Sequence, residues 1–202
     1  DTSCIGMNDQ EPSAIINGII FTKLTTFKVK ELVKSMLEGK SVDSMITEGY
    51  GDGFNGSKNI RAMVVNNLRR KGALLTRDTK SGDALIKAFA MKPAQVIDLV
   101  KQSNIRGRGG AGFPTGLKWE FCRRAAGDVH YVLCNADEGE PGTFKDRVFL
   151  TEYAYQFFEG MALAGYAIGA LQGILYLRFE YKYLEKHLES VLADMRARGE
   201  KV

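Results

Sequence analysis

The chain has 202 residues, 45% hydrophobic and 26% charged, as is typical of a soluble globular protein with one domain, or one domain and part of another. The net charge is only +4 and the basic residues are scattered apart from Arg69-Arg70-Lys71, so we expect no nucleic-acid partner. Three cysteines, Cys4, Cys122 and Cys134, form no CxxC pair and no disulfide framework, which favours a reducing, cytoplasmic location.

Hydropathy is informative at the chain start and in one long apolar stretch. The first residues lack the basic and apolar segments of a secretory signal and have no initiator Met, so we expect an internal piece of a longer polypeptide. The stretch from Met161 to Leu177 is nearly uncharged, which also fits a membrane span. Because glycines interrupt it, we favour a buried helix that breaks at Gly173 into a buried strand, Ile174 to Leu177.

The first 27 residues are predicted to be a small α/β remnant, and residues 28–46 a helix and a short turn. Two apolar runs, Ala14 to Ile16 and Ile19 to Phe21, flank Asn17-Gly18, which is the strongest local signal for a β-hairpin. Apolar residues at helical spacing follow from Val29 to Leu37, with an end at Gly39. A further short turn is expected at Val42 to Ile46.

The next part of the chain contains a linker candidate and two helices. The stretch Tyr50 to Ser57 is rich in Gly and Asn, as linkers are. Ile60 to Leu68 fits a helix or a strand, and Arg69 to Gly72 fits a solvated tip. Amphipathic helices are predicted at Ser81 to Met91 and at Pro93 to Gln102, where Pro93 suits the first helical position. Their expected core residues are Leu85, Ile86, Phe89, Val96, Ile97 and Val100.

The last third of the chain alternates between strand and helix patterns. A strand is predicted at Tyr131 to Cys134, followed by one or two buried helices between Phe144 and Gly169. The strand Ile174 to Leu177 then leads to an amphipathic helix that contains Leu184 to Leu192 and ends at Gly199. This order predicts an α/β fold.

A glycine-rich loop precedes these elements. It runs from Arg106 to Trp119 and contains Gly107, Gly109, Gly110 and Gly112. Because these glycines have no Cβ atom, a ligand can approach the backbone closely, and free N–H groups can point at an anion. Helical spacing resumes near Gly116, so a helix N-terminus and the cations of Arg106, Arg108 and Lys118 favour a phosphate. The alternative is a flexible glycine turn, since neither the P-loop nor the Rossmann spacing is present.

An acidic segment follows the strand at Tyr131. It reads Asn135-Ala136-Asp137-Glu138-Gly139-Glu140-Pro141-Gly142. Carboxylates at the carboxyl end of a strand suit a polar ligand in an α/β crevice, whereas a solvated acidic turn is the plainer alternative. The remaining candidates are judged structural: Cys122 and Cys134 as small buried hydrophobes, and His130 and His187 as lone histidines.

Together the two motifs resemble a known family. The loop Gly-Arg-Gly-Gly-Ala-Gly-Phe-Pro-Thr-Gly-Leu-Lys-Trp and the segment Asn-Ala-Asp-Glu-Gly-Glu-Pro-Gly-Thr-Phe-Lys-Asp-Arg are similar to the FMN- and NADH-binding flavoprotein subunit. That subunit occurs in respiratory complex I, NAD-reducing hydrogenases and NAD-dependent formate dehydrogenases. The resemblance implies a complex I flavoprotein-type (Rossmann-like) FMN-binding domain, incomplete in this chain and preceded by the end of a thioredoxin-like ferredoxin domain.

The resemblance also implies which residues bind the cofactor and the nucleotide. The residues expected to bind FMN are Gly107, Arg108, Gly109, Gly110, Gly112, Lys118, Asn135, Asp137, Glu138 and Tyr176. The residues expected to bind NADH are Phe113, Phe121, Glu140 and Glu180. Without the resemblance, Phe113 and Phe121 would be interpreted as core aromatics. Phe179 departs from the family, in which a small residue precedes this glutamate.

The N-terminal motif points to one subfamily. Cys-Ile-Gly-x-x-Asp-Gln-Glu-Pro, from Cys4, resembles the fused diaphorase subunit of soluble NAD-reducing hydrogenases, with Asn8 where complex I has a second cysteine. Cys4 is therefore a metal ligand only as part of a longer chain. The implied segments are 1–27, the end of a thioredoxin-like [2Fe–2S] domain; 28–92, a linker and helical part; and 93–202, the FMN/NADH-binding part.

The implied activity is hydride transfer between NAD(H) and FMN, with onward one-electron transfer to iron–sulfur clusters. Expected partners are NAD(H) and the other diaphorase and hydrogenase subunits, without direct membrane insertion. The [4Fe–4S] and [2Fe–2S] clusters belong to the longer parent, and this chain alone is expected to hold none. The alternatives are a formate dehydrogenase or complex I subunit, and, in another class, a non-catalytic interaction fragment.

Overall fold

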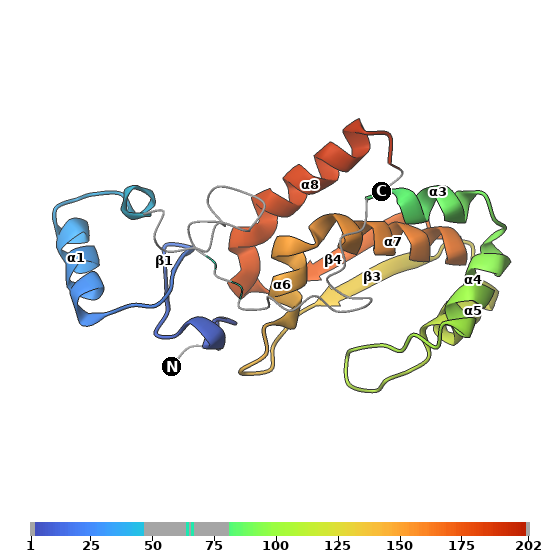
Figure 1. Ribbon diagram of the computed structural model, residues 1–202, viewed down its shortest axis with the longest axis horizontal. Helices are drawn as coiled ribbons and strands as arrows, with labels where there is room; N and C mark the ends of the chain where they lie inside the picture. Colours follow the sequence, from blue (N-terminus) through green and yellow to red (C-terminus); the bar gives the residue numbers. More distant parts are fainter. Residues whose placement is uncertain (1–2, 47–63, 65, 67–80, 201–202) are drawn as a thin grey trace. The chain divides into compact units, whose positions relative to one another are not determined.

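The computed structural model describes residues 3–46, 64, 66 and 81–200 (Figure 1). Helices and strands alternate along the chain, so the predicted α/β class is confirmed. The chain forms two compact units. Unit 1 comprises Asp1–Arg77, Ala136–Ala154 and Leu177–Val191, and unit 2 comprises Asp78–Asn135, Tyr155–Tyr176 and Leu192–Val202. Each unit is described by itself.

The N-terminal hairpin of unit 1 forms where the sequence predicts it. Strands β1 (Ala14–Ile16) and β2 (Ile19–Phe21) are antiparallel, with Ala14 opposite Phe21. Asn17 and Gly18 have φ values of 50° and 80°, as a two-residue hairpin turn matched to strand twist requires. All three β2 residues are buried, so this strand anchors the hairpin.

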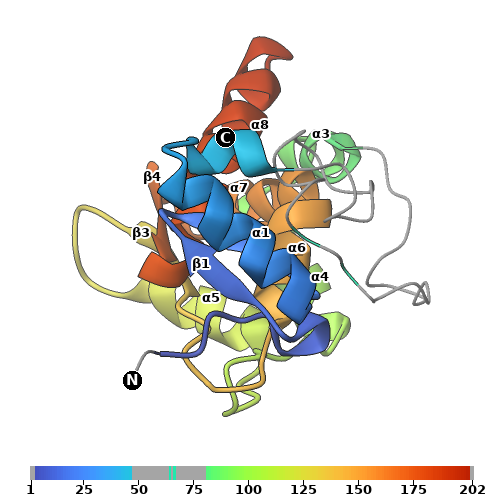
Figure 2. The same cartoon turned by 90° about the vertical axis from the view of Figure 1, so that its left-hand side faces the viewer.

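Helix α1 (Thr26–Leu37) follows the hairpin, as predicted (Figure 2). The side chain of Thr25 accepts a hydrogen bond from the backbone N–H of Lys28 and caps the helix start. Gly39, with φ 77°, follows the helix end, where a left-handed residue is favourable. The predicted turn at Val42 is the 3-10 helix η2 (Val42–Met45); a further one, η1 (Asn8–Gln10), precedes the hairpin.

The remaining elements of unit 1 come from two later parts of the chain. They are helix α6 (Lys145–Glu152), the 3-10 helix η4 (Phe179–Leu184), which contacts α6, and the first half of helix α8 (Glu185–Ala197). Buried residues of these elements are Val148, Leu150, Tyr181, Leu184, Leu188 and Val191. The amphipathic helix before Gly199 is therefore confirmed.

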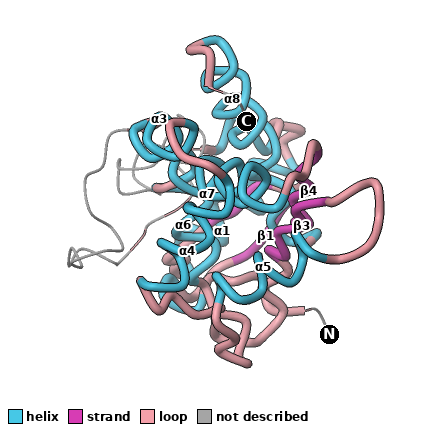
Figure 3. Tube along the Cα trace, turned by 90° about the vertical axis from the view of Figure 1, so that its right-hand side faces the viewer, coloured by secondary structure: helices cyan, strands magenta, loops and turns pink. Residues whose placement is uncertain are grey.

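Unit 2 is built on helices α3 (Asp83–Phe89), α4 (Pro93–Gln102), α5 (Thr115–Arg124) and α7 (Ala154–Ile168). Its hydrophobic cluster contains Ala88, Val96, Ile97 and Ala167, with Met91, Trp119, Leu163 and Tyr166 packed against it. Helices α4 and α5 lie side by side (Figure 3). The prediction that Ile86 lies in the core is wrong. Ile86 is 71% exposed, because the short α3 buries only the face of Leu85 and Ala88. Phe89 is 39% exposed and packs edge-on against Tyr166, so it lies at the margin of the core.

Strands β3 (Tyr131–Ala136) and β4 (Gln172–Leu177) pair with each other, and their arrows point the same way in Figure 1. The predicted break at Gly173 is wrong. Helix α7 ends before Gly169, whose φ is 81°, and Gly173 lies within β4, where a Cβ would meet the Met161 side chain at 3.3 Å.

The strand predicted at Ile174 to Leu177 is present as part of β4, but the prediction that it is buried is wrong. One face of β4 is turned toward α7, but Ile174 and Tyr176 on the other face are 48% and 58% exposed, because no described element covers them. Among the described residues, no helix is long and apolar enough to cross a membrane. The linker candidate Tyr50 to Ser57 and the stretch 60–72, except Val64 and Asn66, lie outside the described residues.

Candidate functional site

The glycine-rich loop of unit 2 is closed at its base by the backbone. Arg106 and Pro114 form an antiparallel bridge, and the N–H of Gly107 donates to the carbonyl of Phe113 at 2.9 Å. The N–H of Thr115 donates to the carbonyl of Ile105 at 2.9 Å. The Arg106 guanidinium donates to the Gly112 carbonyl at 3.0 Å, so this cation braces the loop from within.

The glycines of this loop have open space around them. A Cβ added to Gly109, Gly110 or Gly112 would find no atom within 4 Å. Gly110 and Gly112 have φ values of 103° and 62°, which other residues rarely adopt. The loop therefore presents bare backbone, as the sequence predicts for a bound ligand.

The loop leads directly into helix α5. The cap residue Pro114 supplies no side-chain acceptor, and Lys118 in the first turns and Arg108 in the loop are accessible to solvent. The helix start therefore offers backbone donors and nearby positive charge, both of which favour an anion.

Gly116 in the first turn of α5 has a packing role that the sequence did not indicate. A Cβ at this position would lie 2.6 Å from the backbone nitrogen of Lys101 and 2.9 Å from its Cα. Helix α5 can approach α4 closely because residue 116 has no side chain. The only sequence signal was a glycine inside a helical pattern.

Phe113 and Phe121 are not core residues. They are 45% and 56% exposed, and their ring centroids lie 6.5 Å apart with planes inclined by 51°. The interpretation as plain core aromatics is therefore wrong. Two exposed rings beside each other form a surface on which a planar ligand can stack.

Asn135 and Tyr176 lie near the carboxyl ends of β3 and β4 in unit 2, and both are accessible to solvent. In unit 1, Asp137 and Glu140 of the acidic segment are exposed as well. Glu138 differs from its neighbours because it is only 4% exposed.

The Glu138 carboxylate has partners inside the protein. It accepts hydrogen bonds from the backbone N–H groups of Asp146 at 2.8 Å and Arg147 at 3.3 Å, which lie in the first turn of α6. It also accepts one from the hydroxyl of Tyr181 at 2.6 Å. A carboxylate at a helix N-terminus is favourable, so Glu138 fastens the acidic segment to α6 and η4.

Two buried arginines bind the N-terminal segment of unit 1. Arg147 is fully buried; its guanidinium donates to both carboxylate oxygens of Asp9 at 2.9 Å and to the carbonyl of Gly6 at 2.6 Å. Arg178 donates to the carbonyl of Cys4 at 2.7 Å. The residues around Cys4 thus form part of the same core as the acidic segment.

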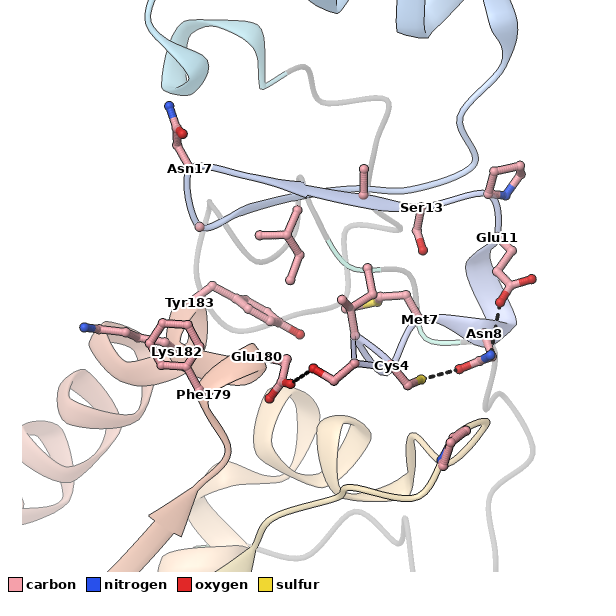
Figure 4. Close-up of a pocket in the computed structure, with 17 residues that line it drawn as sticks. Cys4, Met7, Asn8, Glu11, Ser13, Asn17, Phe179, Glu180, Lys182 and Tyr183 are labelled. Carbon is pink, nitrogen blue, oxygen red and sulfur yellow. Dashed lines mark hydrogen bonds between the residues drawn. The ribbon is translucent and has the colours of Figure 1, made fainter. Parts of the chain in front are cut away.

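Glu180 forms an ion pair with Arg178, and its side chain lies beside the N-terminal segment near Cys4 (Figure 4). Its carboxylate accepts hydrogen bonds from Arg178 Nε at 3.0 Å and from the Ser3 hydroxyl. These two bonds, the Arg178 bond foremost, lower the pKa of Glu180 from the usual 4.5 to about 2, so it is ionised at neutral pH.

The segment around Cys4 also lines a cavity of about 1450 Å³ within unit 1. Cys4, Asn8, Glu180 and Tyr183 are among its lining residues (Figure 4). Cys4 Sγ and Asn8 Oδ1 are hydrogen-bonded at 3.1 Å. No group of three or more His, Cys, Asp or Glu that could hold a metal occurs among the described residues.

The residues judged structural are mostly covered. Cys122, Cys134 and His130 are half-buried. His187 on α8 is 8% exposed, and burial lowers its pKa, which favours the neutral imidazole.

Comparison with known proteins gives consistent matches. Residues 100–201 match the family model described as the Nuo51 FMN-binding domain. The sequence is 46% identical to the NAD-reducing hydrogenase HoxS subunit alpha of Cupriavidus necator over 200 residues, which are 98% of this chain and 33% of that protein. It is 50% identical to an NADH-quinone oxidoreductase subunit of Rhizobium meliloti over 117 residues, 57% of this chain and 28% of that protein.

A solved structure has the same fold. The crystal structure of an NAD⁺-reducing [NiFe]-hydrogenase in the air-oxidized state superposes with a TM-score of 0.84 at 41% identity, over 97% of this chain and 33% of that chain. The chain thus spans about a third, or less, of the length of the relatives it matches.

Proposed function

Because the chain belongs to the family of Nuo51 FMN-binding domains, we propose that it is part of the diaphorase module of an NAD-reducing hydrogenase, which transfers hydride between NAD(H) and FMN. The observation that carries this proposal is the match to HoxS subunit alpha over 98% of the chain. The match to the NADH-quinone oxidoreductase relative covers only 57%. This difference favours a hydrogenase module over a complex I subunit.

The glycine loop fits a phosphate-bearing cofactor. Its bare backbone at Gly109, Gly110 and Gly112, followed by a helix start with Lys118, suits the FMN phosphate and the flavin edge. Gly107 and Arg108 are the other residues of the loop that we propose to bind FMN. Asn135, Asp137 and Tyr176 remain in the proposed FMN-binding set, and Glu138, whose carboxylate is bound by Tyr181 and the start of α6, is proposed to contribute by holding this segment in place.

NAD(H) is the proposed second ligand. The exposed rings of Phe113 and Phe121 suit the stacking of its adenine, and the carboxylates of Glu140 and Glu180 suit hydrogen bonds to the nicotinamide part. Glu180 is held ionised by Arg178, so it can only accept hydrogen bonds. We propose no protein acid or base, since these residues bind and orient two rings and exclude water.

When bound, FMN supplies the exchange between two-electron hydride transfer and one-electron transfer. The proposed acceptors are iron–sulfur clusters held elsewhere in the parent protein and its hydrogenase partners. A cytoplasmic location and the segment boundaries after residues 27 and 92 belong to the same proposal. Cys4 is a proposed metal ligand only within the longer chain.

The test is FMN titration of the chain, followed by quenching of flavin fluorescence. We expect Gly109→Ala to weaken FMN binding, because its methyl group enters the open space that the cofactor would occupy. Residue 109 has no positive φ and no neighbour within 4 Å, so this change leaves the fold intact. Gly160→Ala is the matched control, as Gly160 also has no neighbour within 4 Å but lies in α7.

Anaerobic addition of NADH to the FMN-loaded chain then tests the reaction, since hydride transfer bleaches the visible absorbance of the flavin. If the chain binds no FMN, either alone or extended past Val202, the proposal is refuted. The alternative of a non-catalytic interaction fragment would then be favoured. If Gly109→Ala and Gly160→Ala bind FMN with equal affinity, FMN does not bind at the glycine loop.

A further inference from the structure

Arg178 connects three separate parts of unit 1. It is 4% exposed, and its guanidinium donates to the backbone carbonyl of Glu138, to the backbone carbonyl of Cys4 and to the carboxylate of Glu180. These acceptors belong to the acidic segment, the N-terminal segment and η4. One side chain thus fixes the distances among all three.

A guanidinium is the cationic group best suited to this arrangement. It carries five N–H donors in a rigid planar fork, so Nε, Nη1 and Nη2 can each serve a different acceptor. Arg178 also lies over the ring of Tyr181, 5.3 Å from the centroid, which fixes the plane of the fork. A lysine ammonium is a single point charge and cannot reach three acceptors in these directions.

Glu138 is held from two sides. Arg178 binds its backbone carbonyl, and Tyr181 together with the start of α6 binds its carboxylate. The carboxylate is therefore engaged inside the protein, while its neighbours Asp137 and Glu140 are exposed. Glu138 thus anchors the backbone segment that carries the two exposed carboxylates.

We propose that Arg178 is a positioning residue for nucleotide and flavin binding: it holds Glu180 and, through Glu138, the carboxylates of Asp137 and Glu140 in place. This inference rests on the proposed function. The guanidinium of Arg178 is engaged by acceptors of the protein, so Arg178 is proposed to act through the carboxylates that it holds. Its contribution is to fix carboxylates that would otherwise sample several orientations, and fixed groups bind a rigid ring system better than mobile ones.

The test compares Arg178→Lys and Arg178→Gln with the control Arg198→Gln. Arg198 forms a similar ion pair, 2.9 Å from Asp194, but its side chain is 42% exposed and lies on unit 2. The first readout needs no cofactor: carbon-detected NMR titration of the Glu180 carboxyl. We expect its pKa to rise from about 2 toward 4.5 in both Arg178 variants and to stay unchanged in Arg198→Gln.

The second readout is the affinity of the FMN-loaded chain for NADH. We expect Arg178→Lys to weaken it about tenfold, as for the loss of a charge-assisted hydrogen bond to a positioned group. In the Arg178→Lys background, Glu180→Gln is expected to lower the affinity for NADH by a smaller factor than it does in the unmodified chain, because the two residues act through one contact. A merely structural arginine would give additive losses.

The outcomes separate the two proposals. If the unmodified chain binds neither FMN nor NADH, the proposed function fails and the positioning role fails with it. If the unmodified chain binds both, but a folded Arg178→Lys variant keeps the Glu180 pKa and the NADH affinity, only the positioning role is overturned.

Discussion

The close contact between α4 and α5 allows a quantitative prediction of how Gly116→Ala changes the stability of the protein. The new Cβ would lie 2.6, 2.8 and 2.9 Å from the backbone nitrogen, Cγ and Cα of Lys101, whereas ordinary contacts begin at 3.4 Å. Two of these atoms belong to the backbone and cannot rotate away. Helix α4 must therefore move by several tenths of an ångström.

The expected cost follows from two opposing effects. Overpacking costs about 1–3 kcal/mol, and the higher helix propensity of Ala returns at most about 1 kcal/mol. Because two of the three clashing atoms belong to the backbone, the upper part of the overpacking range applies, about 2–3 kcal/mol; less about 1 kcal/mol of propensity, Gly116→Ala should be less stable by about 1–2 kcal/mol. In the control Gly160→Ala no atom lies within 4 Å of the new Cβ, so only the higher helix propensity of Ala acts. We expect the free energy of unfolding of this control to rise by about 0.5–1 kcal/mol.

The assay is urea unfolding followed by the fluorescence of Trp119. This is the only tryptophan of the chain, it lies in α5, and it packs against the cluster that includes Val96 and Ile97 of α4. A lower urea midpoint for Gly116→Ala and a higher one for Gly160→Ala are expected. If Gly116→Ala is as stable as the unmodified chain, the interpretation of Gly116 as a packing residue is refuted.

Three further predictions concern unit 1. Arg147→Met should lower the free energy of unfolding by about 3–5 kcal/mol, because Asp9 loses its buried ion-pair partner; an unchanged urea midpoint would contradict this. Gly6→Ala should destabilise by about 1–3 kcal/mol, since its Cβ would collide with the hydroxyl and two ring carbons of Tyr181. The loss should be smaller in a Tyr181→Phe background, which lacks the hydroxyl but keeps the ring carbons; equal losses in both backgrounds would exclude a contribution of the hydroxyl. The pKa of Glu180 is lower in the folded than in the unfolded chain, so its contribution to stability is present above pH 4.5 and is lost as the pH falls toward 2; thermal unfolding of Glu180→Gln should lack this part of the pH dependence.

Local signals were sufficient for much of the fold. The Asn17-Gly18 turn, the start of α4 at Pro93 and the amphipathic pattern of α8 depend on residues within a few positions of one another. The backbone preferences of such residues act without the rest of the protein. The two motifs on either side of β3 also pointed to the family that the comparison with known proteins then identified.

Tertiary contacts decided what the sequence pattern left open. Glu138 resembles its neighbours Asp137 and Glu140 in the sequence, yet it is buried because its partners lie 8, 9 and 43 positions away. Hydropathy predicted a buried β4, but the exposure of Ile174 depends on whether another element covers that face.

The same reason applies to the glycines. Gly109 and Gly116 belong to one glycine-rich stretch, and although helical spacing resumes near Gly116, the sequence does not indicate which of the two touches another element. Gly109 faces open space, whereas Gly116 touches the backbone of α4. The family and the local elements could be predicted because both depend on short stretches of chain. Which residues are exposed and which hold the protein together depends on partners that are distant in sequence, so it became visible only in the folded chain.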